Sequence, residues 1–200
     1  MRKVLDDALA LRTMIELPGL DDWQRDVLRS VAGRLVAESD RERKYAALQE
    51  IGESTARYLA EMVAALECDY DRLEELSLKR SGDMDDDEKA ELAALKACAG
   101  ACECESEDDA RQRIQEDPLS IEVSGTWVPG ETPTADRAII LLGTGGPATR
   151  IVCELDHDRE PCRARLEVQD WFQPWTEYRG DAISEEALLK YCACFYFGEG

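Results

Sequence analysis

The chain has 200 residues, enough for one or two domains with a buried core, and 44 Asp and Glu against 24 Lys and Arg give it a net charge of −20. A surface this negative repels nucleic acid phosphates and anionic membranes, so direct binding to DNA or RNA is disfavoured, whereas basic grooves are attracted. The N-terminus lacks a signal-peptide pattern, and no run approaches the about eighteen apolar residues of a membrane span. We therefore expect a cytoplasmic protein whose eight cysteines are reduced unless they bind metal.

The negative charge is concentrated in the middle of the chain. Residues 81–118 contain 13 acidic and 4 basic residues. The preceding 80 residues contain 17 acidic and 13 basic residues, and residues 119–200 contain 14 and 7. The middle segment is thus the most negative part of the chain for its length.

Two helices are predicted at the N-terminus from the spacing of apolar residues. The first covers residues 3–15 and ends before Pro18-Gly19. Asp21 or Asp22 can cap the second. The apolar face of this second helix is expected to contain Trp23, Val27, Leu28, Val31 and Leu35.

A longer helix is predicted from about residue 41 to residue 80, because its apolar residues recur close to every 3.6 positions. Ser81-Gly82-Asp83 breaks it, and a further helix follows over residues 85–99. These two helices are expected to form an antiparallel helical hairpin. A short helix over residues 106–115 follows, with Ser106 and Asp109 spaced like a capping box.

After Asp117-Pro118 the pattern changes to that of strands. They are predicted at residues 119–123, 137–142, 149–155 and 163–169. In the last of them apolar and charged residues alternate, which is typical of an antiparallel sheet with one solvated face. A helix over residues 185–195, capped by Ser184, is expected to cover the other face. The predicted fold class is therefore α+β, with a helical hairpin region at 41–117 and a four-stranded antiparallel sheet plus helix at 118–200.

From about Asp69 onward, the chain contains several distinctive short stretches. They are CDYDRLEEL (68–76), RIQEDPLS (113–120), LGTGGPA (142–148), ELD (154–156), QDW (169–171), PWTEY (174–178) and FYFG (195–198). On these residues the chain resembles a family of uncharacterised proteins carried by bacteriophages, prophages and plasmids. The resemblance implies a mobile genetic element but no activity and no functional residues. Residues 1–40 fall outside it, and we interpret them as a variable helical extension.

Four aromatic residues lie close together near the end of the predicted sheet, namely Trp171, Phe172, Trp175 and Tyr178. Rigid aromatics with a polar atom are frequent anchors in protein interfaces. The alternative is that they pack against the sheet edge as core, which we expect for at least two of them.

Two acidic groups flank the helix predicted at residues 85–99. The first contains Asp83, Asp85, Asp86, Asp87 and Glu88, and the second contains Glu103, Glu105, Glu107, Asp108 and Asp109. Carboxylates spaced along a helix can imitate a line of phosphates and occupy a basic groove. The alternative is a solvated face in which acidic residues stabilise helix starts.

Cysteines provide a chemical alternative. Cys98, Cys102 and Cys104 lie within seven residues and can supply three of the four ligands of a zinc site. Their spacing is not the usual C-x-x-C, and cysteine at a helix end also packs as a small apolar residue. Zinc is therefore an open alternative, and no other cofactor is expected.

Catalytic motifs are weak. His157 is the only histidine and lies in a predicted turn, where a base is hard to hold in register. The glycine-rich stretch Gly143–Pro147 can either cradle a phosphate or form a hairpin turn, but it lacks the lysine and the following helix of a phosphate-binding loop. We therefore expect that the protein is not an enzyme.

Charge and resemblance together lead to one preferred hypothesis. It is a phage-encoded, DNA-mimicking inhibitor that binds a basic nucleic-acid-binding groove on a protein or ribonucleoprotein complex of host defence. An anti-CRISPR protein acting on a CRISPR effector is its most concrete version. The alternatives are a zinc-stabilised structural or regulatory module of a mobile element, and a small nucleotide-binding protein or hydrolase.

Overall fold

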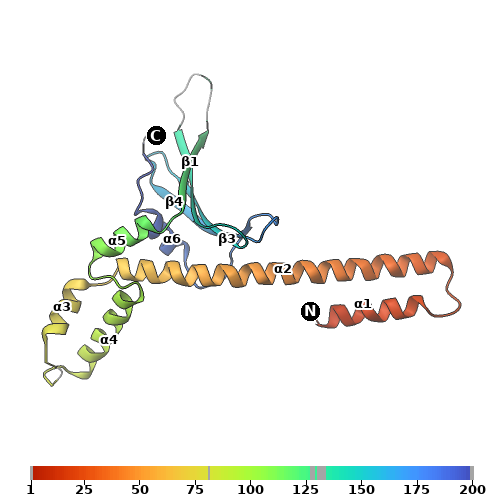
Figure 1. Cartoon of the computed structure of the whole chain (residues 1–200), viewed down its shortest axis with the longest axis horizontal. Coiled ribbons are helices and arrows are strands. Elements are labelled where there is room, and N and C mark those ends of the chain that lie inside the picture. Colours follow the sequence, from red (N-terminus) through yellow and green to blue (C-terminus); the bar gives the residue numbers. More distant parts are fainter. Residues whose placement is uncertain (1, 81, 127–128, 130–133, 199–200) are drawn as a thin grey trace. The chain divides into compact units, whose positions relative to one another are not determined.

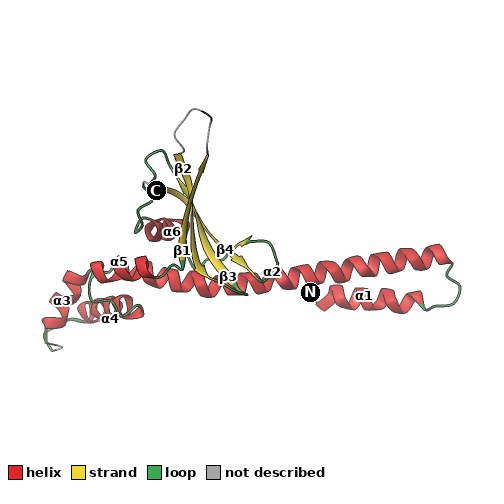
Figure 2. Cartoon of the chain, turned by 45° about the horizontal axis from the view of Figure 1, so that its top comes forward, coloured by secondary structure: helices red, strands yellow, loops and turns green. Residues whose placement is uncertain are grey.

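The computed structural model describes residues 2–80, 82–126, 129 and 134–198 and has an α+β fold (Figure 1). Helices come first, followed by an antiparallel sheet and a C-terminal helix (Figure 2). Within the described residues, no helix has the length and apolar character to cross a membrane. The chain divides into two compact units, which we call unit 1 (Met1–Glu50) and unit 2 (Ile51–Gly200).

The first long helix is α2 (Asp22–Leu66), which follows α1 (Arg2–Ile15) and runs from unit 1 into unit 2. The prediction of two separate helices over this stretch is wrong, because residues 36–40 contain no glycine or proline and nothing there interrupts the helix. The expected region boundary at residue 40 consequently lies inside α2. The helix ends at Leu66 instead of residue 80, since Asp69 caps a new helix by accepting a hydrogen bond from the Arg72 amide at 2.9 Å.

The helical hairpin is formed by α3 (Tyr70–Leu78) and α4 (Asp86–Ala101), so its first arm is shorter than predicted. Arg72 forms an ion pair with Glu91 at 2.8 Å, which joins the two arms. The end of α4 also meets α2, because the Cys98 thiol donates a hydrogen bond to the Ala64 carbonyl at 3.3 Å. Helix α5 (Glu107–Glu116) then begins at the predicted cap, Ser106.

In the part of the chain that the structure describes, five antiparallel strands form one sheet in sequence order. They are β1 (Ser120–Thr126), β2 (Thr134–Gly143), β3 (Ala148–Leu155), β4 (Pro161–Gln169) and β5 (Thr176–Glu177). The first four confirm the predicted strands, with different ends. The fifth was not predicted, because two residues opposite Glu167 and Val168 are too few to show a periodic pattern.

Helix α6 (Glu185–Cys192) covers the apolar face of the sheet, as predicted, although it ends three residues earlier. The register places Ile140, Ile151 and Leu166 side by side on this face, and all three are buried. Buried Tyr191 of α6 donates its hydroxyl hydrogen to Asp117 at 2.7 Å. Asp117 also accepts a hydrogen bond from Tyr58 of α2 at 2.8 Å, so one carboxylate links two helices at the start of the sheet.

A glycine allows α2 to approach the end of the sheet within unit 2. A Cβ atom at Gly52 would lie 2.5 Å from the ring of Tyr178, so the ring rests directly on the helix backbone. The Tyr178 hydroxyl donates a hydrogen bond to Glu53, one residue further along. This hydrogen bond lowers the pKa of the Glu53 carboxyl and, together with burial of the ring, raises the pKa of Tyr178.

Candidate functional site

Two exposed aromatic residues lie in the turn after β4. Phe172 is 97% exposed and Trp171 is 66% exposed. Trp171 has a φ of +46°, a left-handed conformation that is uncommon for a bulky residue. Its indole lies against Gly146, where an added Cβ would be 2.4 Å from the indole Nε1. Gly146 of the β2–β3 turn therefore makes room for Trp171. We call Trp171, Phe172 and Gly146 the aromatic corner.

The other two predicted aromatics are structural. Tyr178 is buried on Gly52, as described above. The ring of Trp175 lies under the Arg150 guanidinium, whose carbon is 4.1 Å from the ring centroid. Arg150 in turn pairs with the buried carboxylate of Glu167 at 2.7 Å. Of the four aromatics, Tyr178 is buried and Trp175 is half-buried, so only Tyr178 fully meets the expectation that at least two of them pack as core.

The N-terminal acidic group comprises Asp83, Asp85, Asp86, Asp87 and Glu88 at the start of α4. Asp85 is the N-cap and accepts a hydrogen bond from the Glu88 amide at 2.8 Å. Asp86 pairs with Lys89 at 3.2 Å, and Glu88 pairs with Lys79 at 2.7 Å. Asp83 and Asp87 are exposed and make no ion pair with any described residue.

The C-terminal acidic group comprises Glu103, Glu105, Glu107, Asp108 and Asp109, between α4 and the first turn of α5. Asp109 accepts a hydrogen bond from the Glu105 amide at 3.0 Å, and Glu107 pairs with Arg111 at 2.8 Å. The other three side chains are exposed and have no ion-pair partner in the described part of the chain. The two acidic groups lie at opposite ends of α4, whose sixteen residues span about 24 Å.

Glu103 occupies an unusual position in the backbone. Its φ is +56°, and it follows the C-cap residue Cys102. The Glu103 amide donates to the Gly100 carbonyl at 3.3 Å, and the Cys104 amide donates to the Ala99 carbonyl at 3.1 Å. This is the Schellman pattern, in which glycine normally occupies the left-handed position. A glutamate there costs conformational energy that a glycine would not.

One exposed apolar residue next to the acidic groups escaped the sequence analysis. Leu78, at the end of α3, is 79% exposed and precedes Lys79, the partner of Glu88. It therefore lies beside the N-terminal acidic group. In the helix predicted over residues 41–80, the 3.6-residue spacing of apolar residues includes Leu76 but not Leu78. The spacing therefore predicts that Leu78 faces outward, but it does not predict that Leu78 contacts a partner.

The three clustered cysteines do not bring their sulfur atoms into one group. The Cys98 thiol faces the Ala64 carbonyl, whereas the Cys104 thiol donates to the Cys102 carbonyl at 3.5 Å. Cys102 and Cys104 are buried, and burial raises the pKa of both thiols, which disfavours the thiolate that binds zinc. Among the described residues, the one set of His, Cys, Asp and Glu side chains close enough to share an ion is Asp156, His157 and Asp158.

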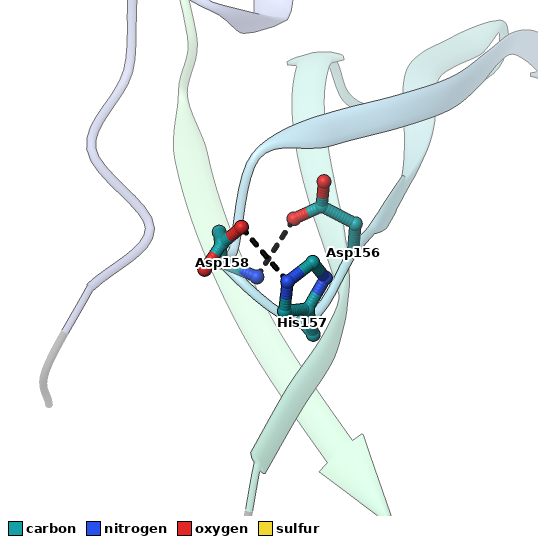
Figure 3. A group of neighbouring side chains, drawn as sticks. All are labelled: Asp156, His157 and Asp158. Atoms are coloured by element: carbon teal, nitrogen blue, oxygen red, sulfur yellow. Dashed lines mark hydrogen bonds and ion pairs between the residues drawn. The ribbon is translucent and has the colours of Figure 1, made fainter.

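This set forms an ordinary turn between β3 and β4 (Figure 3). The Asp156 carboxylate accepts hydrogen bonds from the amides of Asp158 at 2.9 Å and Glu160 at 3.0 Å. His157 lies 3.0 Å from the Asp158 carboxylate, and both side chains are exposed. These hydrogen bonds account for the aspartates as turn formers, and solvent around His157 gives no means of holding a base in place.

A cavity of about 390 Å³ lies between the edge of β4 and the loop leading to α6. Its lining includes Arg163 and Arg165 together with Glu154, Glu177 and Glu185. Neither a histidine nor a cysteine is among the lining residues. The charges of both signs give the cavity no clear preference for one ligand class.

Comparisons with protein-family models, with curated proteins and with solved structures found no match for this chain.

Proposed function

We propose that the protein is a non-enzymatic inhibitor that binds a basic nucleic-acid-binding groove of another complex through the two acidic groups around α4. The observation that carries the proposal is a set of exposed carboxylates without ion-pair partners among the described residues. These are Asp83, Asp87, Glu103, Glu105 and Asp108. None of the five pairs with a base of the described residues or caps a helix, although Asp87 and Asp108 lie in the first turns of α4 and α5, where a carboxylate stabilises the helix start.

The position of Glu103 supports a role beyond stability. Backbone strain at a bulky residue is retained where function requires the side chain, and glycine would relieve the strain at Glu103. Among the described non-glycine residues, positive φ occurs at Glu103, Arg159 and Trp171. Two of these three belong to the residues that the sequence nominates for partner binding.

The dimensions of the acidic surface suit a groove that holds nucleic acid. The sixteen residues of α4 place the two acidic groups about 24 Å apart, which corresponds to about seven phosphate steps along one strand of DNA. Negative charge at both ends can therefore engage two parts of one basic channel. Exposed Leu78 adds apolar contact area beside the first group, and the aromatic corner provides rigid anchors for a second contact.

The most concrete partner is a CRISPR effector complex, whose guide and target strands lie in a positively charged channel. The test is whether the purified protein blocks binding of target DNA by purified effectors of several types. For an effector that is inhibited, a Glu103→Lys, Glu105→Lys, Asp108→Lys variant is expected to weaken inhibition at least tenfold. A variant carrying Glu122→Lys, Glu160→Lys and Asp181→Lys has the same charge change and is expected to inhibit nearly as well as the wild type.

Asp85 and Asp109 are left unchanged in this design because their side chains accept hydrogen bonds from backbone amides at helix starts. Circular dichroism on both variants establishes that they remain folded. Equal loss of inhibition in the two variants would mean that only net charge matters, and the assignment of the surface would then be wrong.

A further inference from the structure

Unit 1 is a two-helix hairpin with a narrow core. α1 lies antiparallel to the first part of α2, and both views show the two helices side by side (Figures 1 and 2). Three of the buried side chains are small, namely Ala8 of α1 and Ala32 and Ser39 of α2, and Ile15 at the end of α1 is the larger one. Arg25 donates a hydrogen bond to the Ile15 carbonyl and holds the connecting turn. Small residues in the seam bring the helices close together but bury little apolar area.

Large apolar side chains remain exposed on one flank of this hairpin. Trp23 is 73% exposed, and Val27, one turn later on α2, is also exposed. At 100° per residue, these two positions lie away from the seam defined by Ala32 and Ser39. The same rotation of 100° per residue along α1 places exposed Met14 on this flank and exposed Leu9 on the opposite flank. We call Met14, Trp23 and Val27 the tryptophan flank.

The charge of unit 1 differs from that of the rest of the chain. Residues 1–50 contain 10 acidic and 9 basic residues, whereas residues 51–200 contain 34 acidic and 15 basic residues. Nearly all of the net negative charge therefore lies outside unit 1. Two copies of this protein repel each other through unit 2 but not through unit 1.

We propose that unit 1 is a dimerisation module, in which the tryptophan flank of one copy packs against the same flank of a second copy. Four helices then enclose the apolar side chains that a two-helix hairpin leaves in water. In a twofold contact, the same patch is contributed by both copies, so a patch with an excess of one charge would repel itself. Unit 1 has nearly equal numbers of acidic and basic residues and avoids this repulsion. A basic partner would instead bind a surface with excess negative charge, and an acidic partner a surface with excess positive charge.

The test is the mass of the full chain in solution, measured by light scattering after size exclusion over a wide range of concentration. The expected result is a particle of twice 22.4 kDa that dissociates on dilution. A Trp23→Ser, Val27→Ser variant is expected to weaken the dimer by about thirtyfold or more, as for the loss of central interface anchors.

Leu9→Ser is the matched control, since Leu9 is 65% exposed in the same unit but lies on the other flank. It is expected to leave the dimer unchanged, and circular dichroism should show equal helix content in all variants. A wild-type chain that stays monomeric at every concentration overturns the proposal. The same holds if the double variant dimerises as strongly as the wild type, or if Leu9→Ser weakens the dimer equally.

Discussion

Substitution of Gly52 by alanine should reveal how tightly the end of the sheet rests on α2. Within an exposed helix, replacing glycine by alanine stabilises by about 1 kcal/mol. At Gly52 the new Cβ would be 2.5 Å from the Tyr178 ring, which is buried and hydrogen-bonded to Glu53, so the ring must retreat by roughly 1 Å. Such overpacking costs about 1–3 kcal/mol. Because the gain and the cost oppose each other, we expect Gly52→Ala to lower the free energy of unfolding by up to about 2 kcal/mol.

The sign of this effect should reverse when the ring is removed. In a Tyr178→Ala background only the Cβ of residue 178 remains near the new methyl group, at 3.1 Å. Gly52→Ala should then stabilise by about 0.5–1 kcal/mol, giving a coupling of about 1–3 kcal/mol between the two positions. Gly33→Ala is the control on the same helix, because nothing lies within 4 Å of its Cβ, and it should stabilise in both backgrounds.

Denaturant unfolding followed by circular dichroism and by tryptophan fluorescence measures all of these variants. If Gly52→Ala stabilises the wild-type chain as much as Gly33→Ala does, Tyr178 does not rest on α2 and the described packing is wrong.

Three further outcomes follow from particular contacts. Glu103→Gly should raise the free energy of unfolding by about 1 kcal/mol in denaturant titrations, because glycine adopts the left-handed conformation of the C′ position without strain. An unchanged midpoint of unfolding would contradict the Schellman assignment. Burial and the Asp117 carboxylate raise the pKa of Tyr191 above its ordinary value of 10. As the pH rises, the Tyr191 hydroxyl therefore loses its proton in the unfolded chain before it does so in the folded one, and the free energy of unfolding falls above about pH 10. Tyr191→Phe should show a smaller alkaline loss in unfolding titrations at pH 9 and 11, and an identical loss would refute this role. Phe172→Ser should leave the melting temperature nearly unchanged but weaken binding to an inhibited partner, and a large loss of stability would mean that the exposed ring is structural.

Local signals in the sequence were sufficient to predict most of the helices and strands of unit 2. Ser106 and Ser184 cap the helices at which their side chains and spacing predicted a start. The alternation in β4 correctly predicted that Ala164 and Leu166 are buried, but Glu167, which it assigned to the solvated face, is buried as well. These features depend on neighbours in the chain. The helix break at Asp69 also has a local cause, but the apolar stripe continues past it into α3 and hid the boundary.

The remaining features depend on contacts between distant residues. No local pattern distinguishes Trp171, which stands on Gly146, from Tyr178, which is buried on Gly52, since both are aromatics after the same strand. The strained backbone of Glu103 is equally invisible in the sequence, because the Schellman turn forms there without its usual glycine. The acidic groups and their separation by the helix at residues 85–99 were predicted from the sequence. That five of the carboxylates have no ion-pair partner among the described residues required coordinates.

We propose that the carboxylates around α4 that have no ion-pair partner within the described ranges occupy a basic nucleic-acid channel. The most direct test is a competition experiment, in which a fixed amount of CRISPR effector with labelled target DNA is titrated with the protein, and the DNA that remains bound is measured at low and at raised salt concentration. We expect that the protein displaces the DNA and that salt weakens this displacement. The Glu103, Glu105 and Asp108 charge reversals should weaken it at least tenfold, and the Glu122, Glu160 and Asp181 reversals should leave it nearly unchanged. Failure to displace DNA from any effector, or displacement that is unaffected by the first set of reversals, would contradict the proposal.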